Sequence, residues 1–253
     1  MAKVIAISNQ KAGVGKTTTA VNLSSCLAVL EKKVLLIDLD PQANATSSLD
    51  IENDSIENGI YQLFEKLCSA SDCIIETKIV NLDIIPSHID LVGIEIESID
   101  LIDRENILMN AIDKIEKEYD YIIIDCPPSL GLLTINALTA SNSVIIPIQC
   151  EYFALEGLGK LLNTIKSIQK IHNKNLSIEG LLLTMYDSRL NLSNQVIKEV
   201  KLHFNEMVFK TIIHRNIKLG EDPSYVESIL DYDVSSTGSN NYLNLARELI
   251  LNS

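Results

Sequence analysis

The chain has 253 residues, of which 46% are hydrophobic and only 5% aromatic, with no tryptophan. This length suits one large α/β domain or two small ones, with a core built from aliphatic side chains. The formal net charge of −13 argues against a protein that coats nucleic acid with a uniformly basic surface. The acidity is regional, however, because residues 50–120 carry 18 acidic and 5 basic side chains, whereas the other 182 residues carry 16 of each sign.

Short runs rich in β-branched residues recur along the chain and predict strands. Several of them are apolar almost throughout, which is typical of parallel strands that are covered on both faces. The predicted strands are 4–8, 34–38, 82–86, 121–125, 144–148, 178–184 and 208–213.

Longer amphipathic stretches lie between these runs and predict helices. Strands that alternate with helices indicate a parallel sheet with right-handed crossovers. Residues 43–80 are the least regular region and are interpreted as an excursion, so residues 1–253 are expected to form a single domain. The predicted helices are 17–30, 107–118, 132–141, 155–170, 192–204 and 242–251.

The most informative stretch is KAGVGKTTT, residues 11–19, which follows a predicted strand and opens a predicted helix. Small residues let the backbone wrap an anion, and the helix N-terminus adds partial positive charge. Lys16 would neutralise phosphate charge, and the Thr17 hydroxyl would bind Mg²⁺. Gln10 stands where the usual GxxxxGK[ST] pattern has its first glycine, and an ordinary glycine turn is the alternative. The candidate nucleotide-binding residues here are Lys11, Ala12, Gly13, Val14, Gly15, Lys16, Thr17 and Thr18.

Two predicted strands end in carboxylates. Asp38 and Asp40 close the run at 34–38 and share one side of an extended chain, and Asp125 ends the run at 121–125. The carboxyl ends of parallel strands gather where ligands bind, and a carboxylate there can hold Mg²⁺ or polarise an attacking water. A loop or helix cap is the alternative for each residue.

These motifs, with two further stretches, resemble the ParA/Soj family of partition ATPases, a branch of the deviant Walker A group. The matching stretches are NQKAGVGKTTTAVNL, VLLIDLDPQANATSS, YDYIIIDCPPSLGLLTINALTAS, VIIPIQCEYFALEGL and RNIKLGEDPS, in family order. The resemblance implies an α/β fold with a doubly wound, mostly parallel sheet and helices on both faces. It also implies slow hydrolysis of ATP with Mg²⁺ in an ATP-sandwiched homodimer, stimulated by a ParB-type centromere-binding partner.

The resemblance also assigns roles to residues. Lys11 matches the lysine that reaches across the dimer to the partner's phosphates, Lys16 the phosphate lysine, and Asp40 the residue that orients the hydrolytic water. Thr17 and Asp125 match the Mg²⁺ site, with Asp125 acting directly or through water. His214 and Asn216 fall at the adenine end of the nucleotide, and Arg189 and Lys218 where the family binds non-specific DNA.

The sequence departs from the family pattern at several positions, among them His214, which replaces a proline, and residues 225–228, which replace the usual Gly-Lys-Pro. Ala12 replaces a glycine, and a methyl group there would be disfavoured if the backbone had a positive φ. Lys218 replaces an arginine and loses its bidentate fork. Asp222 replaces an alanine and should weaken the affinity for DNA.

Two other functions share the same loop. A MinD-like membrane-positioning ATPase needs a basic amphipathic C-terminal helix, whereas residues 243–251 carry one base and one acid and are expected to pack on the core. An iron–sulfur reductase or a carboxylate-activating enzyme is the metabolic alternative, but the five cysteines show no cluster spacing. No stretch has the length of a membrane span, so a cytoplasmic protein without a membrane anchor is expected, and the family resemblance implies that it associates with the nucleoid.

Overall fold

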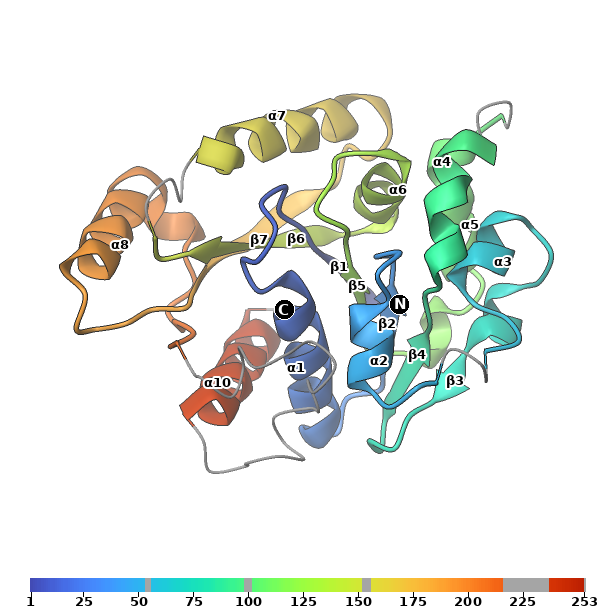
Figure 1. Ribbon diagram of the computed structural model, residues 1–253, viewed down its shortest axis with the longest axis horizontal. Helices are drawn as coiled ribbons and strands as arrows, with labels where there is room; N and C mark the ends of the chain where they lie inside the picture. The colour runs from blue at the N-terminus through green and yellow to red at the C-terminus, as the bar shows by residue number, and fades with distance from the viewer. Residues whose placement is uncertain (53–55, 98–101, 152–155, 216–236, 253) are drawn as a thin grey trace.

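The computed structural model describes residues 1–52, 56–97, 102–151, 156–215 and 237–252. Within these residues, a seven-stranded sheet has the order β3-β4-β2-β5-β1-β6-β7 (Figure 1). Neighbouring strands pair in parallel, apart from β3, which is antiparallel to β4. The strands are β1 (Lys3–Ile7), β2 (Val34–Asp38), β3 (Ile75–Glu76), β4 (Leu82–Ile85), β5 (Tyr121–Asp125), β6 (Ser143–Gln149) and β7 (Ser177–Thr184).

Helices cover both faces of the sheet, as the family resemblance implied. One face packs on α3 (Ile60–Phe64), α4 (Ile94–Glu97), α5 (Ile107–Ile112), α6 (Leu132–Ala140), α7 (Glu156–Ile171) and α8 (Asn191–Phe204). The other packs on α1 (Lys16–Val29), α2 (Asn44–Ser48) and α10 (Thr237–Leu251). All five residues of β2 and of β5 are buried, which explains their almost continuous apolar sequence. The doubly wound α/β fold is therefore confirmed.

The prediction of a strand at 208–213 is wrong. The amides of Phe209 and Ile213 donate to the carbonyls of Leu181 and Leu183 of β7. Between these two hydrogen bonds the segment advances by four residues, whereas β7 advances by two. The amides of the extra residues, Lys210 and Thr211, instead bind the Glu248 carboxylate of α10 at 2.7 and 2.9 Å. The segment therefore follows the sheet edge without forming a regular ladder.

The structure also differs from the prediction at the end of one helix and in the short elements of the region 43–80. The predicted helix at 107–118 ends at Ile112 and is followed by a 3₁₀ turn at Glu116–Glu118, with the buried Ile115 between them. The region 43–80 contains α2, α3 and β3, and its Ile60 and Phe64 belong to the same buried cluster as β2 and β5. The sequence indicated none of these short elements.

The C-terminal helix α10 packs on the core, as expected. Tyr242, Leu245 and Leu249 are buried in one cluster with Leu23 and Leu27 of α1. The Tyr242 hydroxyl also lies 3.2 Å from the Thr19 hydroxyl. Among the described helices, none has both the length and the apolar character that a membrane crossing requires.

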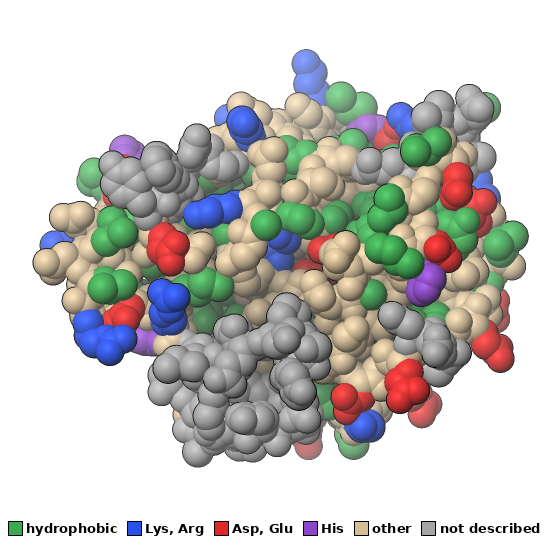
Figure 2. All heavy atoms as spheres, viewed as in Figure 1, with side chains coloured by type: hydrophobic (Ala, Val, Ile, Leu, Met, Phe, Trp, Pro, Cys, Tyr) green, Lys and Arg blue, Asp and Glu red, His purple; other side chains and the backbone are tan. Residues whose placement is uncertain are grey.

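The regional acidity of the sequence becomes an acidic side of the molecule. Figure 2 shows acidic side chains gathered over the half of the visible face that carries α3, α4, β3 and β4. Lysine and arginine side chains are more frequent on the opposite half, over α7 and α8. The net charge of the chain therefore does not describe the surface around α8.

Candidate functional site

The loop at 9–15 joins β1 to α1 at the carboxyl edge of the sheet (Figure 1). Gly13 and Gly15 have φ angles of 72° and 87°, a left-handed backbone that favours glycine. Ala12 is exposed and is not among the residues with positive φ, so its methyl group causes no strain of this kind. The loop turns directly into the first residue of α1, Lys16, which gives the geometry of an anion site at a helix N-terminus.

Two polar side chains that the sequence analysis missed hold this loop. Asn9 accepts a hydrogen bond from the Lys11 amide at 2.9 Å and donates one to the Pro147 carbonyl at 2.7 Å. The Thr184 hydroxyl donates to the Val14 carbonyl at 2.9 Å. Asn9 is the first residue of a quoted family motif, but its partner on β6 could not be known before the sheet order.

Lys16 lies beneath the loop and is 7% exposed. Its Nζ donates to the Lys11 carbonyl at 3.3 Å. Burial lowers the pKa of the Lys16 ammonium, whereas the nearby Asp125, Cys126 and Asp40 raise it. The ammonium is thus bound to the loop and attracted by nearby carboxylates, in a position where an anion would find it largely desolvated.

Asp125 ends β5 and is fully buried, and neither of its carboxylate oxygens has a hydrogen-bond partner among the described residues. Burial raises its pKa well above the usual range, as do Asp38 and Asp40, whereas the Thr17 hydroxyl and Lys16 lower it. Two buried oxygens without partners, beside a hydroxyl at the start of α1, are the hard donors that Mg²⁺ prefers. The residues present therefore fit a magnesium ion.

Asp38 and Asp40 have different surroundings at the end of β2. Asp38 is fully buried, stands opposite Asp125 in the β2–β5 pairing, and accepts from the Thr46 amide at 2.9 Å and hydroxyl at 2.7 Å. Burial raises its pKa to about 6, against the effect of these hydrogen bonds. Its other oxygen accepts from the Asp40 amide at 3.1 Å. Asp38 therefore fixes the backbone that carries Asp40.

Asp40 is 8% exposed and lies close enough to Lys16 and Asp125 to influence the pKa of both. One of its oxygens accepts from the Gln42 amide at 3.0 Å. The structure thus brings together Lys16, Thr17, Asp40 and Asp125, as the two sequence motifs predicted. Thr18 lies in the first turn of α1, where its carbonyl accepts from the Asn22 side chain at 2.8 Å.

His214 lies apart from this cluster, beside the end of β7. Its amide donates to the Asn241 side chain at 3.1 Å, and its ring stands edge-on to Tyr186 at a centroid distance of 5.2 Å. These contacts tie the 208–215 segment to α10. Asn216, the other residue assigned to the adenine end, lies outside the described residues.

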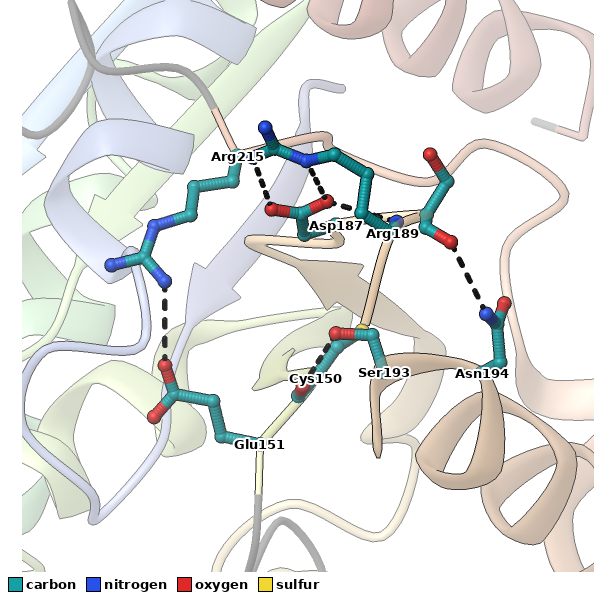
Figure 3. Close-up of polar contacts among 8 residues, drawn as sticks. Cys150, Glu151, Asp187, Arg189, Ser193, Asn194 and Arg215 are labelled. Carbon is teal, nitrogen blue, oxygen red and sulfur yellow. Dashed lines mark hydrogen bonds and ion pairs between the residues drawn. The ribbon is translucent and has the colours of Figure 1, made fainter. Parts of the chain in front are cut away.

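Arg189 lies in the turn between β7 and α8, where its side chain is 87% exposed (Figure 3). Its guanidinium donates to both oxygens of Asp187, at 2.9 and 2.7 Å. These bonds lower the pKa of Asp187 to about 2. The nearby Arg215 faces Glu151 at 3.9 Å, so each of these arginines has an acidic neighbour. Lys218 and Asp222 lie outside the described residues.

Comparison with known proteins relates this site to a family. A family model described as an AAA domain matches residues 2–178. The sporulation initiation inhibitor protein Soj of Bacillus subtilis is 56% identical over 252 residues, which cover 100% of both chains. The chromosome partitioning protein ParA of Myxococcus xanthus is 48% identical, over 98% of this chain and 88% of that protein.

Solved structures with the same fold carry nucleotides. Cobyrinic acid a,c-diamide synthase from Mycobacterium smegmatis with bound ADP and magnesium aligns with a TM-score of 0.87 at 35% identity, covering 99% of this chain and 94% of that one. A putative plasmid partition protein from Borrelia burgdorferi, bound to AMPPNP, aligns with a TM-score of 0.83 at 28% identity, covering 100% and 99%. The Soj and ParA proteins, at 56% and 48% identity, are more similar to this chain than the synthase is at 35%. The chain therefore belongs to the ParA/Soj family of chromosome-partitioning ATPases.

Proposed function

We propose that this chain is an ATP-dependent DNA segregation switch that acts as a single ATPase domain. The observation that carries the proposal is the buried, unpartnered Asp125 carboxylate beside Thr17 and Lys16 at the N-terminus of α1. A buried carboxyl group whose oxygens lack hydrogen bonds costs about 1–3 kcal/mol, so such a group is typical of a site that a ligand completes.

The chemistry follows from the position of each group. The amides of residues 13–18 and the Lys16 ammonium bind the phosphates of ATP, and Thr17 and Asp125 hold the magnesium ion, Asp125 directly or through water. Bound Mg²⁺ neutralises charge that develops on the phosphates. Asp40, on its rigid backbone, accepts a hydrogen bond from the attacking water and orients it. His214 and Asn216 contact the adenine end.

Lys11 acts on a second copy of the chain. Among the described residues, its ammonium forms no salt bridge, and Lys11 is half-buried, next to the exposed Ala12 and Gly13. In a homodimer that forms with ATP between the subunits, this lysine reaches the phosphates of the partner. Hydrolysis removes the shared ligand, so the dimer separates and the switch returns to its starting state.

DNA binding is the output of the switch. Arg189 and Lys218 contact DNA phosphates without reading base sequence, and the dimer doubles the number of contacts. Asp187 competes with DNA for the Arg189 guanidinium, which keeps the affinity of one subunit low. A ParB-like centromere-binding protein stimulates hydrolysis and releases the dimer from the nucleoid.

The test is retention of non-specific DNA with ATP, with ADP and without nucleotide, at two salt concentrations. We expect retention with ATP at low salt and its loss at high salt, because phosphate contacts release counterions. Equal retention with ADP, or no retention under any condition, would refute the proposal. Lys16→Ala, which removes the phosphate lysine, is the negative control.

A further inference from the structure

The side chain of Asn9 continues the sheet where the main chain leaves it. After β1 ends, the Ser8 amide still donates to the Ile145 carbonyl of β6 at 3.1 Å. The carbonyl two residues further along β6, that of Pro147, accepts from the Asn9 side-chain amide at 2.7 Å. Asn9 is 4% exposed, so these bonds are shielded from water. The Asn9 side chain therefore donates the next hydrogen bond to β6, which a main-chain amide would donate if β1 continued.

The other end of the Asn9 side chain fixes Lys11. Its Oδ1 accepts from the Lys11 amide at 2.9 Å, so the backbone of Lys11 is tied through one side chain to β6. The Lys11 carbonyl in turn accepts from the Lys16 ammonium. The direction in which the Lys11 side chain leaves the loop thus depends on Asn9.

The phosphate-facing part of the loop has separate anchors. Thr184 of β7, which is 2% exposed, holds the Val14 carbonyl at 2.9 Å. The Thr19 amide donates to the Gly15 carbonyl at 2.9 Å, which ties residue 15 to α1. The backbone of residues 14–19 is therefore anchored by β7 and α1, and the Lys16 ammonium at 3.3 Å from the Lys11 carbonyl connects it to the part of the loop that Asn9 fixes.

We infer that Asn9 is a positioning residue for Lys11, and that Thr184 is a positioning residue for the phosphate cradle. The inference rests on the role of Lys11 given in the proposed function. It predicts that the two anchors affect different steps. Loss of Asn9 impairs the formation of the ATP dimer and its turnover, whereas loss of Thr184 impairs nucleotide binding by each subunit.

The experiment compares Asn9→Ala with Thr184→Val, using Thr184→Ser as the conservative control and Lys11→Ala as the reference. It measures the Kd for a fluorescent ADP analogue (mant-ADP), kcat at saturating ATP, ATP-dependent dimerisation, and the melting temperature without nucleotide. For Asn9→Ala we expect kcat about tenfold lower and dimerisation about tenfold weaker, with the Kd within about threefold of the wild type. For Thr184→Val we expect a Kd raised about tenfold, which Thr184→Ser restores.

Several outcomes of this experiment would overturn the inference. In the first, Asn9→Ala lowers the melting temperature while kcat and dimerisation stay at wild-type values, so Asn9 is only structural. In the second, Asn9→Ala raises the Kd for mant-ADP about tenfold and spares kcat. In the third, Lys11→Ala itself is fully active, which refutes the role of Lys11 in the proposed function as well. If Lys11→Ala is defective and Asn9→Ala is unaffected, the inference about Asn9 is overturned and the proposed role of Lys11 stands.

If Asn9→Ala does not fold, Asn9→Asp takes its place. This variant replaces the donor to Pro147 with an oxygen at unchanged size, and the same outcomes apply to it.

Discussion

Replacement of Asp38 by asparagine should change how the stability of the nucleotide-free protein depends on pH. Burial raises the pKa of Asp38 from 3.8 to about 6, so between these values the folded chain holds a proton that the unfolded chain has released. Stability is therefore lost as pH rises through this window, by about 3 kcal/mol in total at about 1.4 kcal/mol per pKa unit. Roughly half of this loss falls between pH 5 and 7.5. Asp38→Asn removes this titrating group. As pH rises from 5 to 7.5, the free energy of unfolding of the variant should therefore rise by that amount relative to that of the wild type.

Urea unfolding at fixed salt measures this difference, from pH 5 upward to stay above the sequence pI of about 4.7. The asparagine oxygen can still accept from Thr46, but its NH₂ group then faces the Asp40 amide, which is also a donor, so a constant offset of about 1 kcal/mol is expected at all pH values. Asp187→Asn is the control, because the pKa of Asp187 is lowered to about 2, below the measured range. Parallel curves for the wild type and Asp38→Asn between pH 5 and 7.5 would refute the reasoning about this buried carboxylate.

The remaining predictions concern catalysis, the loop and a cysteine pair. Asp40→Ala should bind ATP normally and stop turnover, because this carboxylate acts on water and not on ATP; a steady-state phosphate assay beside a binding titration checks it. Gly13→Ala should lower stability by about 1–2 kcal/mol in thermal melts, because its φ is 72°, whereas Ala12→Gly should cost only a few tenths. Cys68 and Cys73, whose sulfurs lie 3.1 Å apart, should form an intramolecular disulfide with hydrogen peroxide, which is reduced to water; peptide mapping by mass spectrometry detects it.

Each of these has a result that contradicts it. Normal hydrolysis by Asp40→Ala would reassign the water-orienting residue. Equal melting temperatures for Gly13→Ala and the wild type would mean that the loop takes up the strain elsewhere. Two free thiols after peroxide treatment, with the fold intact, would show that the cysteines cannot close to bonding distance.

The grouping of Lys16, Thr17, Asp40 and Asp125 could be predicted from the sequence because its signals are local. The glycine and lysine pattern at 11–19 specifies a turn and a helix start within nine residues. Asp40 and Asp125 follow apolar strand runs, and parallel strands deliver their carboxyl ends to one edge whatever the order of the strands. The residue types and the position in each run were therefore sufficient, without any knowledge of which strands are neighbours.

The anchors of the loop could not be predicted because their partners are distant. Asn9 binds a carbonyl on β6, and Thr184 binds the loop from 170 residues further along the chain. The same limit explains the segment at 208–213, whose apolar pattern is that of a strand. Its amides are bound by Glu248 from α10, and no local pattern indicates that competition.

The distribution of charge sets a condition on the proposed DNA binding. The acidic side chains of the visible face gather mainly over α3, α4, β3 and β4, and the acidic neighbours of Arg189 and Arg215 are Asp187 and Glu151. Arg189 is nevertheless bound to Asp187 by two hydrogen bonds, and a DNA phosphate must replace them at little net gain. One subunit alone therefore binds DNA weakly under the proposed function. Two such sites held in one dimer bind as a unit, and the effective concentration of the second site raises the affinity without any new contact. In the proposed function, binding of DNA depends on ATP because the nucleotide controls the dimer and not the arginine.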